Sequence, residues 1–266
     1  MTGPIPLAPW QIAAAASLLV VNGLISVWLR LGLERTLAVA TVRSVAQLAF
    51  LGLILEPVFR AGSPWLVGAI CVVMITFAAH AAVQRSSRTV AGLFPSSLLA
   101  LAIGGGGTAV LGTAAIVQVE PWWEPRYLIP MLGMILGNGL TGISLGLDRS
   151  LQQMDEGRDR IDALLAFGAT PWEASGGVAG EAVRTGMIPI LNSMTVVGIV
   201  MIPGMMTGQI LGGTPPVQAA LYQMLILFLI AAATAIGTLV SVLLSLRSVF
   251  DEAGRLRPER ITRRAG

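Results

Sequence analysis

A small set of polar and sulfur-bearing side chains stands inside long apolar stretches of this sequence, where each is costly to bury. Gln47 follows Arg43 by one helical turn, so both would lie on one helix face. Intramembrane charges normally face a bundle interior or a water-filled path, which favours a transport role for this pair over structural hydrogen bonding. We predict that a substrate path is lined by Arg43, Gln47, Asn138, Asn192, Met201, Met205, Met206 and Gln209.

The methionines beside Gln209 leave the substrate open. Thioethers suit soft cations such as Cu(I), whereas Fe(II) prefers imidazole or oxygen donors. Methionine is also a flexible packing residue, and packing is the favoured interpretation here. The sequence has one histidine, His80, and one cysteine, Cys71. Neither a multi-histidine site nor a thiolate cluster is therefore expected, and the metal ligands are unknown.

Two short motifs are typical of enzymes, but their setting argues against that function. The segment from Gly142 to Gly146 matches the GxSxG nucleophile elbow, yet it lies in an apolar stretch with no strand-to-helix turn. The four glycines at 104–107 resemble a phosphate loop, but a Walker A loop requires a lysine and the sequence contains none. We expect these glycines to serve helix packing, and we expect no catalytic residue and no cofactor in this chain.

The composition is that of a membrane protein. Hydrophobic residues make up 55% of the chain and charged residues 12%, against about 25% charged in soluble domains. Seven apolar stretches, at about 9–29, 36–55, 64–83, 92–117, 127–147, 186–211 and 219–246, each reach the roughly 20 residues of a membrane-spanning helix. The predicted fold is all-α, a polytopic transmembrane helical bundle of about seven spans in a single domain, 1–266.

The arginines predict how the chain is oriented. Most of them lie in the connections after the first, third, fifth and seventh stretches. By the positive-inside rule those connections are cytoplasmic, so the N-terminus is outside and the C-terminus is inside a plasma (inner) membrane. The basic tail at about 247–266 is then cytoplasmic. We interpret the formal charge of +3 as the result of these arginines, which orient the chain in the lipid membrane. We therefore expect no nucleic-acid partner.

The longest cytoplasmic connection, at about 148–185, contains an amphipathic stretch. Ile161, Leu164 and Leu165 follow helical spacing, and Gly168 and Pro171 end the pattern. Such an apolar stripe either rests on the membrane surface or fills a groove on a soluble partner. A protein partner is favoured over an anionic lipid surface by the acidic residues of the first turns, Asp155, Glu156 and Asp159.

A family signature overlaps this stretch. Asp162, Ala163, Leu164 and Gly168 resemble the EAAxxxG signature by which ABC importer permeases dock on their ATPase, with Asp for Glu and Leu for the second Ala. The Ile-x-Leu-Pro that continues the importer pattern is absent at the matching place. The predicted ATPase-docking residues are Glu156, Asp162, Ala163, Leu164, Gly168 and Pro171.

Three longer stretches resemble one family more specifically. PMLGMILGN at 130–138, IPILNSM at 188–194 and PGMMTGQILGG at 203–213, together with Arg43 and Gln47, resemble the FetB family of iron export permeases, which includes plant permeases linked to aluminium tolerance. The resemblance covers about 30–251. It implies the membrane subunit of an ABC transporter that exports a metal ion, iron by resemblance. It also implies a homodimer and a separate cytosolic ATP-binding subunit that carries ATP and Mg²⁺.

Two other functions stay open at this stage. A secondary transporter would also be a helical bundle with an interrupted span, such as the one at Pro203 and Gly204. Ion coupling usually needs carboxylates at membrane depth, and the acidic residues here lie at or beyond the ends of the spans. An ion channel needs no diagnostic side chain, because backbone carbonyls can form its filter.

Overall fold

The computed structural model describes residues 6–263, and most of them are helical. The helices are α1 (Pro9–Trp28), α2 (Glu34–Ala61), α3 (Pro64–Arg85), α4 (Leu93–Leu101), α5 (Thr108–Leu111), α6 (Pro125–Glu156), α7 (Arg158–Ala166), α8 (Pro171–Val196), α9 (Gly204–Leu211) and α10 (Pro216–Val249). Two-residue strands β1 (Arg88–Thr89) and β2 (Thr262–Arg263) pair antiparallel, and a 3₁₀ turn covers Pro258–Arg260. The predicted all-α class is confirmed.

Six helices in the described part of the chain are long and apolar enough to cross a membrane. They are α1, α2, α3, the continuous rod Leu93–Ile116, α6 and α10. The sixth predicted stretch, 186–211, is not one helix: α8 ends at Val196 and α9 begins at Gly204. Gly198 adopts a φ of 82°, and Pro203 has no amide hydrogen to donate, so a regular helix cannot continue through this point.

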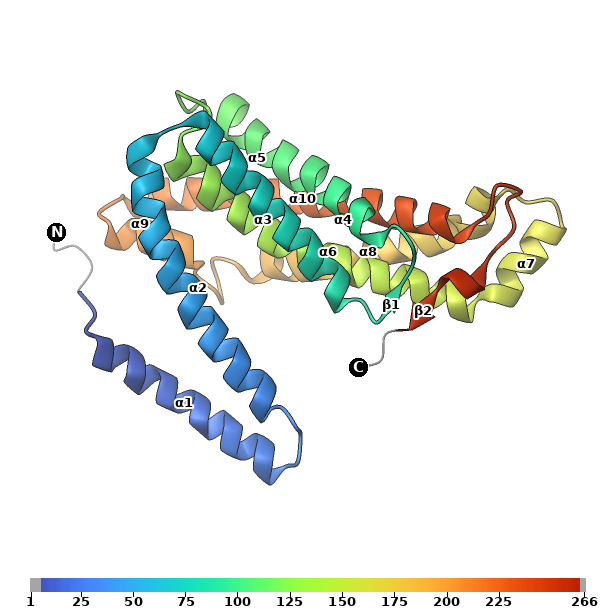
Figure 1. Cartoon of the computed structure of the whole chain (residues 1–266). Coiled ribbons are helices and arrows are strands. Elements are labelled where there is room, and N and C mark those ends of the chain that lie inside the picture. Colours follow the sequence, from blue (N-terminus) through green and yellow to red (C-terminus); the bar gives the residue numbers. More distant parts are fainter. Residues whose placement is uncertain (1–5, 264–266) are drawn as a thin grey trace.

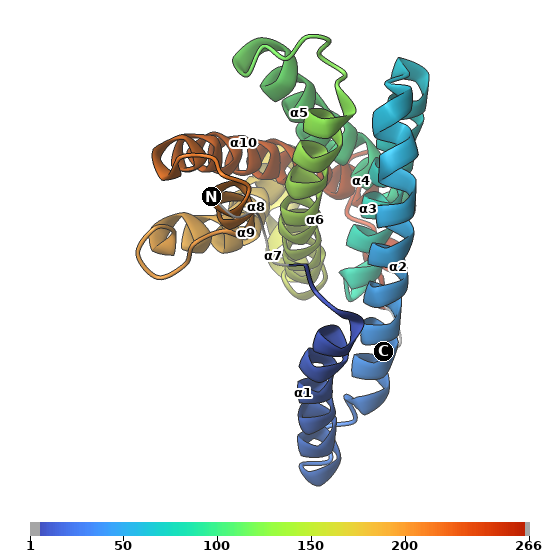
Figure 2. The ribbon, with the colours of Figure 1, turned by 90° about the vertical axis from the view of Figure 1, so that its left-hand side faces the viewer.

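Small residues hold α6, α8 and α10 together. Gly142 of α6 and Gly186 of α8 meet so closely that a Cβ on Gly186 would lie 2.6 Å from the Gly142 carbonyl oxygen. The same Cβ would lie 2.7 Å from Cγ2 of Thr238 on α10. Gly146 makes the equivalent approach one turn along α6, against Thr238 and Ala182. The tight contact of Gly142 and Gly146 is therefore made within this chain, among three helices that Figure 2 shows side by side.

The four-glycine run is a packing element, as predicted. It lies in the π-helical stretch Ala102–Gly107, which joins α4 to α5. A Cβ on Gly104 would lie 2.8 Å from the carbonyl oxygen of Ala233 and from the amide nitrogen of Gly237, both on α10. Glycine is needed there because the backbones of two helices approach each other without room for a side chain.

The α1–α2 hairpin stands apart from the rest of the molecule. The most apolar window of α2 is 0% buried and that of α1 is 6% buried, against 56% for α6 and for α10. Ile54 and Val58, near one end of α2, pack on the body, and from there the hairpin diverges from it (Figure 1). Most of α2 therefore has no cover within this chain.

The connections sort to two ends of the molecule. β1, α7 and β2 lie together at one end, and the 117–124 connection and the α9–α10 turn lie toward the other (Figure 1). The predicted docking connection and the basic tail thus share an end, while the orientation of that end in a membrane stays a prediction. Residues 1–5 and 264–266, with Arg264 of the predicted tail, lie outside the described residues.

The glycine contact yields a stability prediction. Gly186→Ala places a methyl group against the backbone of α6, and overpacking of this kind costs about 1–3 kcal/mol. Gly180→Ala on the same helix meets open space and gains helix propensity. We expect the thermal midpoint of unfolding in detergent, followed by tryptophan fluorescence, to fall for Gly186→Ala and to hold or rise for Gly180→Ala. Equal midpoints would contradict the packing account.

Candidate functional site

The predicted docking segment forms a fixed helical turn at one tip of the molecule. α7 follows α6 after Gly157, and Gly168, with a φ of 91°, ends it. Thr170 then caps α8: its Oγ1 accepts a hydrogen bond from the amide of Glu173 at 3.3 Å, and its own amide donates to the Glu173 carboxylate at 2.8 Å. The Thr170 amide and then its hydroxyl stabilise the charged carboxylate, so the pKa of Glu173 is lowered. Pro171 occupies the first turn of α8, where its missing amide hydrogen costs nothing.

The apolar stripe of α7 faces inward. Ile161 is 2% exposed, and Leu164 and Leu165 are half-buried against the hydrophobic core. The sequence pattern predicted that this stripe would rest on the membrane surface or fill a groove on a partner. In the structure it packs on the chain's own core instead. The polar face of α7 is the exposed one, and it carries the predicted docking residues Asp162 and Ala163.

Two aromatic side chains at this tip were missed by the sequence reasoning. Phe167 is 91% exposed just before Gly168, and Trp172 is 60% exposed in the first turn of α8. We call this pair the tip aromatics. Their signal in the sequence was weak, because a single aromatic beside a helix stop looks the same whether it points into the core or into solvent.

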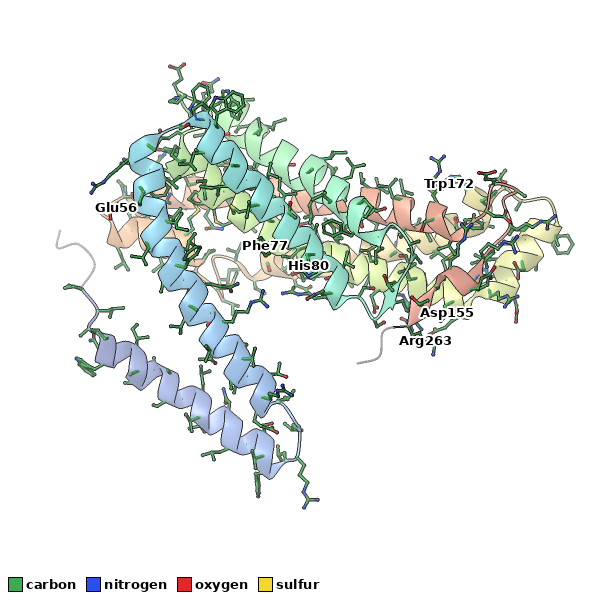
Figure 3. All side chains as sticks on the ribbon, viewed as in Figure 1. Glu56, Phe77, His80, Asp155, Trp172 and Arg263 are labelled. Atoms are coloured by element: carbon green, nitrogen blue, oxygen red, sulfur yellow. The ribbon has the colours of Figure 1, made fainter. Side chains whose placement is uncertain are left out.

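Ion pairs fix the base of this tip to the basic tail. Arg88 of β1 is buried, and its Nε donates to Oδ2 of Asp155 at 3.2 Å while its Nη2 donates to Glu156 at 3.1 Å. Arg263 of β2 donates to the same Asp155 oxygen at 2.9 Å. β1 and β2 pair with Arg88 opposite Arg263. The predicted docking residue Glu156 thus belongs to this network at the end of α6, and Figure 3 shows Asp155 and Arg263 close together there.

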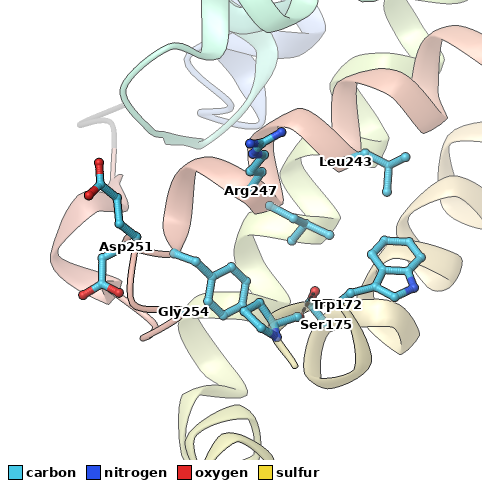
Figure 4. A pocket seen from close by; sticks show the side chains of 10 residues that line it. Trp172, Ser175, Leu243, Arg247, Asp251 and Gly254 are labelled. Atoms are coloured by element: carbon cyan, nitrogen blue, oxygen red, sulfur yellow. Dashed lines mark hydrogen bonds between the residues drawn. The ribbon is translucent and has the colours of Figure 1, made fainter. Parts of the chain in front are cut away.

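The turn after α10 lies against the start of α8. Oδ1 of Asp251 accepts a hydrogen bond from the backbone amide of Arg255 at 2.8 Å, and Arg257 donates to Oδ2 at 2.9 Å. Both interactions, the amide first, lower the pKa of Asp251. Gly254 of this turn approaches the Pro171 ring. A groove of about 620 Å³ opens beside it between α8 and α10, lined by Trp172 and Arg247 among others (Figure 4).

The predicted path residues fall into two groups on different faces of the chain. Arg43 and Gln47 lie exposed on α2, and neither makes a hydrogen bond within the described residues. Asn138 is exposed on α6, with its Nδ2 donating to the Met134 carbonyl at 2.9 Å. The second group surrounds the interruption between α8 and α9 and comprises Asn192, Met201, Met205, Met206 and Gln209. α6 lies between α2 and α9 (Figure 2), so one chain does not bring the groups together.

The availability of hydrogen-bond partners differs between Gln209, one of the path residues, and His80 of α3. Oε1 of Gln209 is buried and has no hydrogen-bond partner, whereas His80 on α3 is exposed and hydrogen-bonds to Gln84 at 2.8 Å. No cluster of three or more His, Cys, Asp or Glu residues capable of holding a metal occurs between residues 6 and 263. The metal ligands of this chain stay unassigned.

Comparison with known proteins places the chain in a family. Residues 9–250 match the model of the Uncharacterised protein family (UPF0014). The chain belongs to this family. It is 37% identical to the "UPF0014 membrane protein slr1647" of Synechocystis over 232 residues. These residues cover 86% of this chain and 88% of the relative. No solved structure matches it.

Two other relatives carry more specific names. The chain is 31% identical over 247 residues, 92% of its length and 93% of the relative's, to the Escherichia coli protein named "Probable iron export permease protein FetB". It is 28% identical over 246 residues, 92% of its length and 88% of the relative's, to "Protein ALUMINUM SENSITIVE 3" of Arabidopsis thaliana. The name of the first relative supports a membrane transport role for this UPF0014 protein.

The UPF0014 match includes the tip and both groups of path residues, and it ends before the returning tail. Arg88 and Asp155 of the ion network lie inside the matched range, whereas Arg263 lies beyond it. The pair between Arg88 and Asp155 is consequently the part of the network that lies wholly within the UPF0014 region.

That pair gives a prediction. Arg88→Gln leaves two carboxylates without their buried partner, and hydrogen bonds to charged groups contribute about 1.5–3 kcal/mol. We expect a drop of several degrees in the thermal midpoint. Arg60→Gln is the matched control, because the Arg60–Glu56 pair is 78% and 68% exposed and exposed pairs contribute little. An unchanged midpoint in Arg88→Gln would contradict the prediction that these ion pairs stabilise the base of the tip.

Proposed function

We propose that this UPF0014 protein is the membrane-spanning permease subunit of an ABC transporter. It works as a homodimer in the plasma (inner) membrane and exports a metal ion, with iron as the first candidate. A separate cytosolic subunit binds ATP and Mg²⁺ and hydrolyses the ATP. The name of the E. coli relative supports the permease assignment and the ion, and the absence of lysine from the sequence supports ATP binding on another chain.

The tip aromatics are the observation that carries the partnership. An exposed phenylalanine and tryptophan at the end of the molecule that carries α7 are surface that water solvates poorly. Aromatic side chains are enriched among the residues that dominate protein–protein affinity. Phe167 and Trp172 are therefore the anchors of the docking surface, with Asp162 and Ala163 at its polar rim.

The packing of the tip suits the transmission of force. Ile161 fixes α7 to the core, and the Thr170–Glu173 cap fixes the start of α8. When two ATP-binding subunits close on ATP, they push both tips of the dimer. α8 carries the displacement along its length to the interruption near Gly198, where the path residues of α9 begin. Alternating access to the path then follows ATP hydrolysis.

A secondary transporter or an ion channel without an ATPase partner is the second candidate. The interruption between α8 and α9 favours it, because discontinuous spans line the substrate sites of many secondary transporters. Such proteins have no need of an aromatic docking surface on a soluble tip. Substrate flux in proteoliposomes that contain this chain alone would favour this candidate.

Truncation of the tip anchor tests the proposal. Phe167→Ala removes exposed apolar surface without disturbing a core contact, and loss of a binding anchor weakens affinity by about tenfold or more. Trp65→Ala is the control, because Trp65 is 87% exposed on α3, near the opposite end of the chain's fold. The measurements are the affinity of nanodisc-embedded permease for its ATP-binding subunit and Fe(II)-stimulated ATP hydrolysis in proteoliposomes.

Weaker binding and lost stimulation in Phe167→Ala, with Trp65→Ala like wild type, is the expected result. If wild type binds no ATP-binding subunit, the ABC assignment fails and the channel or secondary transporter takes its place. If wild type binds it and Phe167→Ala binds equally well, the docking surface lies elsewhere.

A further inference from the structure

The interruption between α8 and α9, residues 197–203, leaves backbone acceptors without donors. The amides of Ile199 and Val200 both donate to the Val196 carbonyl, and Gly198 donates to the Met201 carbonyl. The carbonyl oxygens of Ile199 and Val200 accept no hydrogen bond within the described residues. Their side chains are 90% and 80% exposed. The loop is thus polar along its backbone, apolar in its side chains, and uncovered.

This loop lies deep in the span. α8 and α10 run antiparallel, and Gly186 meets Thr238, so Val196 at the end of α8 is level with roughly residue 228 of α10. That level is about 18 Å from the Pro216 end of α10, whose 34 residues extend about 51 Å. Irregular backbone at membrane depth occurs only where protein buries it or where it lines water. Because the side chains of Ile199 and Val200 are apolar, protein is the cover that fits.

α2 offers the complementary chemistry. Arg43 and Gln47 supply hydrogen-bond donors, and no acceptor within the described residues meets them. Arg43 lies about 27 Å along α2 from its Ala61 end, well inside this 28-residue helix. A charged side chain at this depth is costly in lipid and requires a polar or protein environment.

We propose that α2 of a second copy covers the 197–203 loop. The donors of Arg43 and Gln47 in one copy then face the free carbonyls of the loop in the other. A two-fold axis repeats the contact, so that each copy gives one α2 and receives one. The inference rests on the proposed dimeric permease and deepens it, because each contact unites the two groups of predicted path residues from different chains.

Cross-linking between two tagged copies tests the contact. In a Cys71→Ala background, one copy carries Gln47→Cys and the other carries Ile199→Cys, and the membranes are treated with a short bis-maleimide. We expect a cross-linked dimer bearing both tags, at least tenfold above the level given by Trp65→Cys with Ile199→Cys. The contact is overturned if Ile199→Cys copies link only to each other, or if the two-tag dimer does not exceed that control.

A second variant keeps the test independent of the introduced thiols. Arg43→Leu removes the donors and keeps α2 apolar, so we expect the dimer fraction, counted by single-molecule photobleaching in nanodiscs, to fall at least tenfold, and Arg60→Leu to leave it unchanged. An unchanged dimer fraction in Arg43→Leu overturns the proposal. Neither experiment uses nucleotide or the ATP-binding subunit. A permease that binds that subunit but lacks the cross-link overturns this contact and leaves the proposed function standing.

Discussion

The structure depends on one constraint: inside a bilayer, every backbone amide and carbonyl needs a partner that lipid cannot supply. Helices satisfy that requirement within themselves, which is why the apolar stretches of the sequence appear as α1, α2, α3, the rod Leu93–Ile116, α6 and α10. Even the four-glycine run, which on flexibility alone would form a loop, stays helical as a π-helical stretch. Glycine then serves a second purpose, because a helix that lacks side chains can approach α10 backbone to backbone.

At the end that carries α7, polar side chains are paired with groups from the tail and from the short connections, not within one helix. Arg88 is buried but paired with two carboxylates, and the β1–β2 pair aligns Arg263 with the same site. Arginines that the sequence suggested as mere orientation signals therefore also bind the tail to the base of the tip. The same contacts hold α7 in place while leaving Phe167 in solvent.

The sequence predicted the helices more accurately than it predicted the contacts between them. The lengths of the apolar stretches predicted seven spanning helices, and six of them form helices long and apolar enough to span, because length and hydropathy are local properties. The sixth stretch, 186–211, is also long and apolar, but Gly198 and Pro203 impose a local geometry that interrupts the helix. The helical spacing of Ile161, Leu164 and Leu165 correctly predicted an amphipathic helix. It could not say which molecule would cover the stripe, and the chain's own core does so. The path residues were grouped by chemistry alone, and the topology divides them between α2, α6 and the α8–α9 interruption.

α8 connects the tip to the irregular loop between α8 and α9. α8 begins at the Thr170 cap beside the tip aromatics and ends at Val196, where the interruption starts. Between them, Gly186 packs on α6 and α10 with no room for a side chain, and in the proposed mechanism a displacement at one end of α8 is carried toward the other. Gly198 and Pro203 then provide the point where that movement is absorbed, since the loop between them lacks a helical hydrogen-bond ladder. In the proposed transporter, this break in the helical hydrogen-bond ladder is where movement of α8 meets the path residues of α9.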